Sequence, residues 1–117
     1  MLSRSASRIP TRSFNDLRDY FRTLSDCARL SILDHLASSP DDLKVSDLAR
    51  AVRMSQPLCS WHLRRLVRIG LVKMRRVGRE ARCSLDRARL REYQHTFSKL
   101  LDEHYAHAAT RAALGRK

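Results

Sequence analysis

The residues with the most suggestive chemistry lie between positions 55 and 68, where polar and basic side chains recur at helical spacing. On a helix, this segment would turn four apolar side chains inward: Cys59, Leu63, Leu66 and Val67. The outward side chains are then Ser55, Gln56, Pro57, Ser60, Trp61, Arg64, Arg65 and Arg68. Amide, hydroxyl and guanidinium groups on an exposed helix can bond to base edges in the major groove or to phosphates. The segment therefore indicates a nucleic-acid-binding helix, although half-buried packing is an equal alternative for Trp61.

The net charge is concentrated around this segment. The 117 residues include 24 Lys and Arg against 12 Asp and Glu, a formal net charge of +12. Residues 53–91 hold twelve basic residues and two acidic ones, which leaves ten of the twelve net charges in one third of the chain. This concentration favours a polyanionic partner over a basic face kept for solubility, because each neutralised phosphate releases condensed counterions. Three further arginines are expected to contact the same partner: Arg76, Arg79 and Arg82.

Two histidines near the C-terminus are candidates for a metal site. His104 and His107 lie one helical turn apart, a spacing at which two imidazoles can share a metal ion. Such a site would also require carboxylate or thiolate partners close by, and the neighbouring candidates are His95, Asp102 and Glu103. A divergent zinc or nickel site is thus the alternative to a polar helix face. We expect the polar face, with no metal and no other cofactor.

The cysteines offer a second route to sensing. Cys27 falls at the N-terminus of an expected helix, where the helix dipole favours a thiolate, whereas Cys59 faces the expected core. A redox sensor is therefore an alternative, but no partner cysteine can be assigned. Neither thiol pairs persuasively with a histidine, so we predict a protein that is not an enzyme.

Helical patterns fill the first part of the chain. The first two helices are expected to begin after the N-caps Ser13 and Asp26, a short third helix at Ser46, and a fourth after the N-cap Ser55. The fourth helix should stop at Gly70. The apolar stripe of the first helix is Phe14, Leu17, Phe21 and Leu24. The inner face of the second holds Leu30, Leu33 and either Leu36 or Ala37.

The pattern changes after residue 70. Residues 71–76 and 82–85 read as two strands around a turn that contains Gly78, and Asp86 can cap a long last helix. An isolated terminal helix with an apolar stripe must pack on something, and in a domain this small a second copy of the chain is the expected partner. We expect the first and last helices to form a homodimer interface through Phe14, Leu17, Phe21, Tyr93, Phe97, Leu100, Leu101 and His104.

The segment from Leu24 to Leu85 resembles the arsenic-repressor-like (ArsR/SmtB) family of transcriptional regulators. The resemblance covers about half of the chain, and Cys27 stands where the family pattern has proline. It rests on motifs that agree in order and spacing: Leu24-Ser25-Asp26-Cys27-Ala28-Arg29-Leu30, Val45-Ser46-Asp47-Leu48-Ala49, Met54-Ser55-Gln56-Pro57-Leu58-Cys59-Ser60-Trp61-His62-Leu63, Gly70-Leu71-Val72 and Arg75-Arg76-Val77-Gly78-Arg79.

The resemblance implies a homodimeric repressor that occupies an inverted-repeat operator and leaves it on a signal. Two metal sites of the family can be tested on the residues. The cysteine pair of one is missing, and three arginines stand where the other requires acid and imidazole: Arg87, Arg89 and Arg91. We therefore expect zinc, nickel, cadmium and arsenite to leave DNA affinity nearly unchanged.

The sequence thus predicts a mainly helical winged helix-turn-helix protein with a small β-hairpin. Its expected parts are a flexible basic arm over residues 1–13, rather than a transit peptide, the domain over residues 14–110, and a basic tail over residues 111–117. The expected partners are double-stranded DNA and a second copy, with no membrane and an unknown effector, in a bacterial cytoplasm near the nucleoid. A metal- or thiol-responsive derepressor, or an RNA-binding or ribosome-associated protein, is the alternative.

Overall fold

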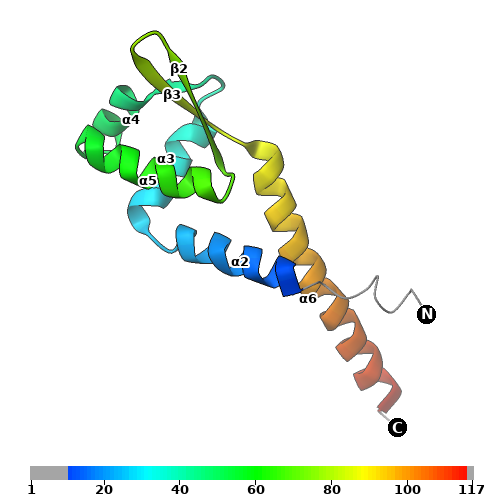
Figure 1. Cartoon of the computed structure of the whole chain (residues 1–117). Helices are drawn as coiled ribbons and strands as arrows, with labels where there is room; N and C mark the ends of the chain where they lie inside the picture. The colour runs from blue at the N-terminus through cyan, green and yellow to red at the C-terminus, as the bar shows by residue number, and fades with distance from the viewer. Residues whose placement is uncertain (1–10, 116–117) are drawn as a thin grey trace.

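The computed structural model describes residues 11–115, apart from the side chains of residues 11–12 and 103–107. Most of the helices and a small sheet gather at one end of the last helix, whose C-terminal half extends away from them (Figure 1). The elements are, in order, α2 (Thr11–Leu24), α3 (Cys27–Ser38), β1 (Leu43–Lys44), α4 (Val45–Ala51), α5 (Gln56–Arg68), β2 (Val72–Val77), β3 (Glu80–Leu85) and α6 (Arg87–Gly115). None of the described helices is both long and apolar enough to span a membrane.

Three of the expected helix caps are confirmed. The carboxylate Oδ1 of Asp26 accepts from the amides of Ala28 and Arg29, at 2.9 and 3.2 Å. The hydroxyl of Ser55 accepts from the amide of Leu58 at 3.3 Å, and Oδ1 of Asp86 accepts from the amide of Arg89 at 3.0 Å. Each cap satisfies amides that have no partner inside the helix, and together they fix where α3, α5 and α6 begin.

Other expected boundaries are wrong. Ser13 lies inside α2 and is not its N-cap. The helix expected to start at Ser46 starts one residue earlier, at Val45, and Lys44 precedes it without a side-chain cap. The arm expected over residues 1–13 therefore ends inside a helix, while residues 1–10 lie outside the described residues. At the other end, α6 continues through Arg111 to Gly115, so the expected tail begins inside that helix. Serine occurs both at helix caps and inside helices, and a basic segment occurs both in helices and in tails. Composition alone therefore does not locate the ends of α2, α4 and α6.

The sheet contains the expected hairpin and one additional strand. Strands β2 and β3 pair antiparallel from Val72 opposite Leu85 to Val77 opposite Glu80, which leaves Gly78 and Arg79 as the turn. Gly78 has φ of 64°, a left-handed conformation that glycine adopts without a Cβ clash. The short β1 pairs with the outer side of β3, giving the order β1-β3-β2. With two residues, β1 is too short to leave a periodic signal.

A single apolar core joins α3, α4, α5 and the base of the hairpin. Its most buried large side chains come from all of these elements: Ile32, Leu48, Leu63, Leu66, Leu71 and Val45. Two residues predicted to face the core are exposed, Leu30 at 48% and Val67 at 39%. Phe14 and Phe21, from the apolar stripe of the first helix, are likewise exposed at 46% and 42%. On α3, Ile32 and Leu36 supply the buried face, so Leu30 turns toward solvent. On α5, the buried face includes His62 in addition to Cys59, Leu63 and Leu66, and Val67 lies outside this face.

Helix α2 packs against α6 through aromatic rings. Tyr20 stacks on Tyr93 with ring centroids 4.3 Å apart, and the Tyr93 hydroxyl donates to the carbonyl of Ile69 at 2.7 Å. Leu17 is also buried within the chain, at 5% exposure. Leu17 and Tyr93 are both expected at a homodimer interface; within this chain Leu17 is buried and Tyr93 is partly buried.

Candidate nucleic-acid interface

The outward face of α5 carries the polar and basic residues that the sequence placed there. Gln56, Pro57, Arg64, Arg65 and Arg68 are exposed, and Ser60 is partly exposed. Proline fits the first turn because its missing N–H would have no partner there, and Ser55 caps the helix end. The sequence of α5 contains no acidic residue that would oppose a polyanion. Its exposed face can therefore approach phosphates and base edges together.

A contact that sequence reasoning missed holds α5 against α3. His62 is 6% exposed, and its Nδ1 accepts from Nε of Arg29 at 3.2 Å. The same guanidinium donates through Nη1 to the carbonyl of Thr23 at 2.8 Å. Arg29 thus ties the end of α2 to the inner face of α5. The signal was present in the sequence, because both residues belong to the motifs quoted for the family resemblance, but spacing alone did not pair them.

The N-cap carboxylate of α3 contributes to this contact. Oδ2 of Asp26 lies 3.6 Å from Nη2 of Arg29, whose side chain is only 12% exposed. Burial alone would raise the pKa of Asp26, but the backbone hydrogen bond from Arg29, its charge and the hydrogen bond from Ala28 lower the pKa overall. Asp26 is thus a charged cap that also helps to position the Arg29 guanidinium.

Trp61 is half-exposed and held by its neighbours. The guanidinium carbon of Arg65 lies 4.6 Å from the Trp61 ring centroid, and that of Arg29 lies 5.7 Å away. The ring also meets the His62 ring edge-on, with centroids 5.0 Å apart. Cations over an indole face are attracted by its quadrupole. Trp61 is therefore both a packing residue and a surface residue, at 40% exposure.

The hairpin presents two of its expected arginines at its tip. Arg76 and Arg79 are exposed, and Nη1 of Arg76 donates to the carbonyl of Arg79 at 3.4 Å. Arg79 occupies the two-residue turn beside Gly78. Both side chains can reach a nucleic-acid backbone next to a groove that holds α5.

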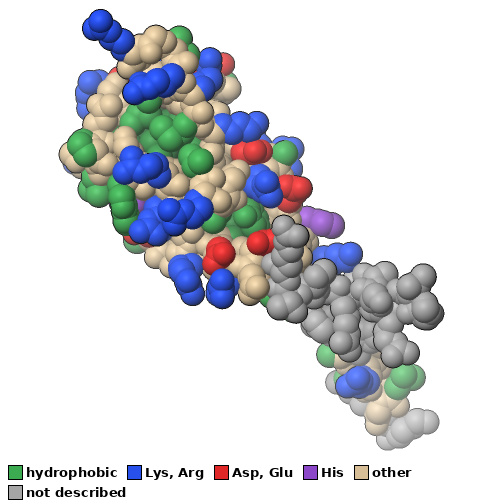
Figure 2. All heavy atoms as spheres, viewed as in Figure 1, with side chains coloured by type: hydrophobic (Ala, Val, Ile, Leu, Met, Phe, Trp, Pro, Cys, Tyr) green, Lys and Arg blue, Asp and Glu red, His purple; other side chains and the backbone are tan. Residues whose placement is uncertain are grey.

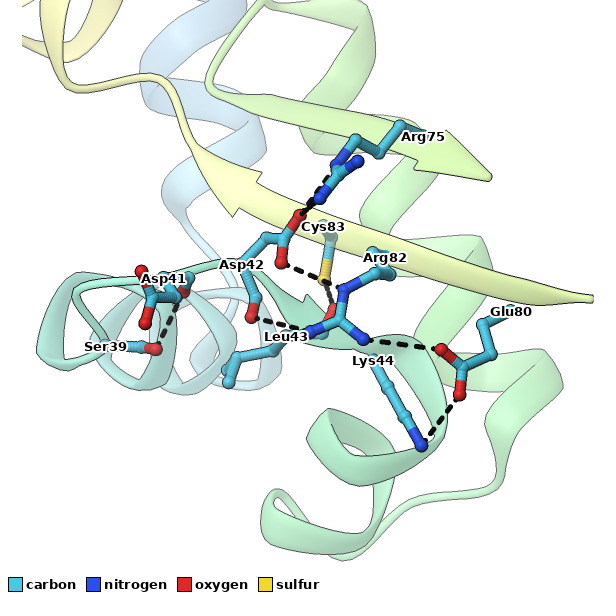
Figure 3. Close-up of polar contacts among 9 residues, drawn as sticks. All are labelled: Ser39, Asp41, Asp42, Leu43, Lys44, Arg75, Glu80, Arg82 and Cys83. Carbon is cyan, nitrogen blue, oxygen red and sulfur yellow. Dashed lines mark hydrogen bonds and ion pairs between the residues drawn. The ribbon is translucent and has the colours of Figure 1, made fainter. Parts of the chain in front are cut away.

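Arg82 differs from the expectation. Its side chain is 24% exposed, and its Nε donates to Oδ1 of Asp42 at 2.9 Å. The other oxygen of Asp42 accepts from Nε of Arg75 at 2.7 Å, and Nη1 of Arg82 lies 3.4 Å from Oε1 of Glu80. Nζ of Lys44 completes this cluster 2.7 Å from Oε2 of Glu80 (Figure 3). Arg82 therefore positions the hairpin, because two carboxylates already occupy its guanidinium.

The same cluster sets the ionisation of its carboxylates. Hydrogen bonds from Arg82 and then Arg75 lower the pKa of Asp42 below its ordinary value. The hydrogen bond from Lys44 likewise lowers the pKa of Glu80. Both groups are charged at neutral pH, so the cluster joins β1, β2 and β3 through ionic hydrogen bonds.

The three cysteines lie in different surroundings. Burial raises the pKa of the Cys59 thiol, and burial raises that of Cys83 to about 12, whereas Cys27 is exposed at the start of α3. The side chains of His104 and His107 lie outside the described residues. Within residues whose side chains are described, no three potential metal ligands lie together.

An apolar surface runs along α2 and α6 on the part of the molecule away from the hairpin. Phe21 meets Phe97 edge-on with ring centroids 4.9 Å apart, and both rings are exposed on their other sides. Phe14 and Leu101 are also exposed, and Leu100 is partly exposed. Large apolar side chains that line up across two helices are typical of a protein interface.

The sequence is similar to a family of bacterial regulatory proteins. Residues 26–74 match the model of the family described as bacterial regulatory protein, arsR family. A transcriptional repressor SmtB homolog from Synechocystis sp. is 41% identical over 69 residues, covering 59% of this chain and 51% of that protein. This chain thus spans about half the length of that repressor.

Solved structures extend the similarity to most of the chain. An ArsR-like transcriptional regulator from Rhodococcus sp. RHA1 superposes with a TM-score of 0.78 at 29% identity, covering 89% of this chain and 96% of that one. The homodimeric winged helix-turn-helix DNA-binding domain of a Mycobacterium bovis protein superposes with a TM-score of 0.62 at 27% identity, covering 80% and 85%. In the winged helix-turn-helix fold that these structures share, α4 and α5 form the helix-turn-helix, and the β2–β3 hairpin forms the wing.

Proposed function

We propose that this chain is a winged helix-turn-helix regulator of the arsR family that binds specific sequences of double-stranded DNA as a homodimer and represses transcription there. The observation that carries the proposal is the outward face of α5, which presents polar and basic side chains on a helix fixed from behind by Arg29 and His62. The inverted-repeat operator and the repression by occlusion rest on the resemblance to family members.

The arrangement of charges supports duplex DNA as the partner. Arg64, Arg65 and Arg68 lie on the exposed side of α5, and Arg76 and Arg79 lie at the wing tip. A recognition helix enters the major groove, and a wing contacts the neighbouring backbone or minor groove. Gln56 and Ser60, near the start of α5, are placed to bond base edges.

The exposed apolar surface supports a homodimer. Phe14, Phe21, Phe97 and Leu101 would be covered by the same residues of a second copy, as a two-fold interface requires. Two copies would then offer two α5 helices to successive turns of the major groove, which explains an inverted repeat.

DNA selection from random duplexes with the purified chain tests the proposal. We expect enrichment of one inverted repeat, and we expect affinity for it to fall steeply as salt rises. Structured RNA of equal length in a parallel titration is the control for charge alone. Equal affinity for that RNA and for all duplexes would contradict the proposal.

The oligomeric state is tested on α6. We expect the double substitution Phe97→Asp with Leu101→Asp to give monomers, because a two-fold interface would bury four unpaired charges. A matched control is His95→Asp with Lys99→Asp, which adds acidic groups on the opposite side of α6 by helical spacing. Light scattering that still reports a dimer for the first variant, with helicity unchanged, would locate the interface elsewhere.

A further inference from the structure

The face of α5 that carries the arginines also carries an apolar strip. Leu58 is 46% exposed and Trp61 is 40% exposed, and the two lie one turn apart with Pro57 beside them. Arginine and lysine side chains border apolar side chains on the face shown in Figure 2. Exposed apolar groups inside a strongly basic face call for a partner that is itself apolar at those points.

The orientation of Trp61 is set before any partner arrives. Arg65 covers its ring at 4.6 Å from the centroid, and His62, itself bonded to Arg29, meets the ring edge-on. A side chain that is already ordered loses little conformational entropy on binding. The ring can therefore act as a fixed contact surface.

We propose that Trp61 and Leu58 read the 5-methyl groups of thymine in the major groove; this inference rests on the proposed binding of duplex DNA by α5. Each base pair presents polar donors and acceptors there, and the thymine methyl is the apolar feature among them. Two arginines that flank the strip, Arg65 and Arg68, are complementary to phosphates and would hold the strip at groove depth. The operator half-site accordingly carries thymine where Trp61 and Leu58 lie.

The test replaces thymine by deoxyuridine, one position at a time, in the best duplex obtained by selection. This change removes a methyl group and leaves base pairing intact. At the contacted positions we expect the affinity of the wild-type chain to fall about fourfold, which corresponds to the transfer free energy of one buried methyl group. Trp61→Ala should lose the effect at one position and Leu58→Ala at its neighbour. Val67→Ala, which truncates another exposed apolar side chain of α5, should retain both effects.

Each other outcome overturns the inference. Neutral substitution at every thymine, or a selected site without thymine in its half-sites, rejects methyl reading while leaving DNA binding intact. Methyl effects that persist in both alanine variants assign the reading to other residues. Failure to enrich any sequence removes the proposed function and this inference together.

Discussion

Helix α5 and the wing are both basic, but they are fixed to the protein in different ways. Helix α5 is held from its buried side, where His62 accepts from an Arg29 side chain that is only 12% exposed. The wing is held nearer the surface, where Asp42 binds both the 65% exposed Arg75 and the 24% exposed Arg82. Buried contacts are weakly screened by salt, whereas exposed ion pairs weaken as salt rises. We therefore expect added salt to loosen the wing more than it loosens α5.

The same difference divides the arginines by task. Arg29 of α3 supports α5 through His62, while Arg64 and Arg68 of α5 are exposed at the surface. On the wing, Arg75 and Arg82 are engaged by Asp42, which leaves Arg76 and Arg79 for a partner. Net charge therefore overstates the number of contacts available to DNA.

The largest expected effect comes from removing the buried anchor of α5. Arg29→Met should lower the free energy of unfolding by about 2–3 kcal/mol, because His62 and the Thr23 carbonyl lose a charged donor. Urea unfolding followed by circular dichroism measures this loss. Arg22→Met, an exposed change on α2, is the control and should leave stability nearly unchanged. Equal stability of the two variants would contradict the claim that Arg29 anchors α5 from its buried side.

The next effect concerns reading by α5. Arg64→Ala should weaken binding to the selected duplex by about 1–3 kcal/mol if it contacts a base, with the fold unchanged. Fluorescence anisotropy with labelled duplex gives the affinity, and Arg18→Ala on α2 is the matched control. An Arg64→Ala affinity equal to that of the control would move the reading surface away from this face.

A smaller effect is expected at the wing tip. Arg79→Ala should reduce affinity to a similar degree for all duplexes and lower the slope of log affinity against log salt by about one, as expected for one lost phosphate contact. Titrations at several salt concentrations measure the slope. A loss confined to the selected sequence would instead assign Arg79 to base reading and weaken the contrast between the two regions.

The smallest effect is a dependence on pH in the wing cluster. The pKa of Asp42 is depressed below its ordinary value of 3.8, so its stabilising contribution is present above that pH and is lost as pH falls through the folded-state pKa. Asp42→Asn removes this contribution. The difference in melting temperature between wild type and variant should be constant above pH 3.8 and shrink below it. A difference that persists unchanged in acid would show that Asp42 acts through shape and not charge.

Local signals in the sequence were sufficient for the elements that position the site. The caps Asp26, Ser55 and Asp86 act within three residues of themselves, and the turn at Gly78 needs only glycine and a pair of alternating strands. The surface position of the α5 arginines followed from helical spacing. Such features depend on neighbours in the chain and can be predicted without the fold.

Features that depend on distant neighbours could not be predicted. The bond from Arg29 to His62 spans 33 residues, and that from Arg82 to Asp42 spans 40. From the sequence alone, Arg82 on the hairpin is expected to be available to a partner, and nothing indicates that His62 faces the core of the protein. The stacking of Tyr20 on Tyr93 similarly removes Tyr93 from the surface that its apolar stripe suggested. In each case, the partner that decides the role comes from another element.

The position of Trp61 has an optical consequence. It is the single tryptophan of the chain, so indole fluorescence comes entirely from the exposed face of α5, beside the guanidinium groups of Arg65 and Arg29. Emission excited in the indole band is therefore an intrinsic, label-free record of events on this one helix. A ligand that covers α5 and excludes water should shift the emission to shorter wavelength, whereas one that touches only the wing should leave the spectrum in place.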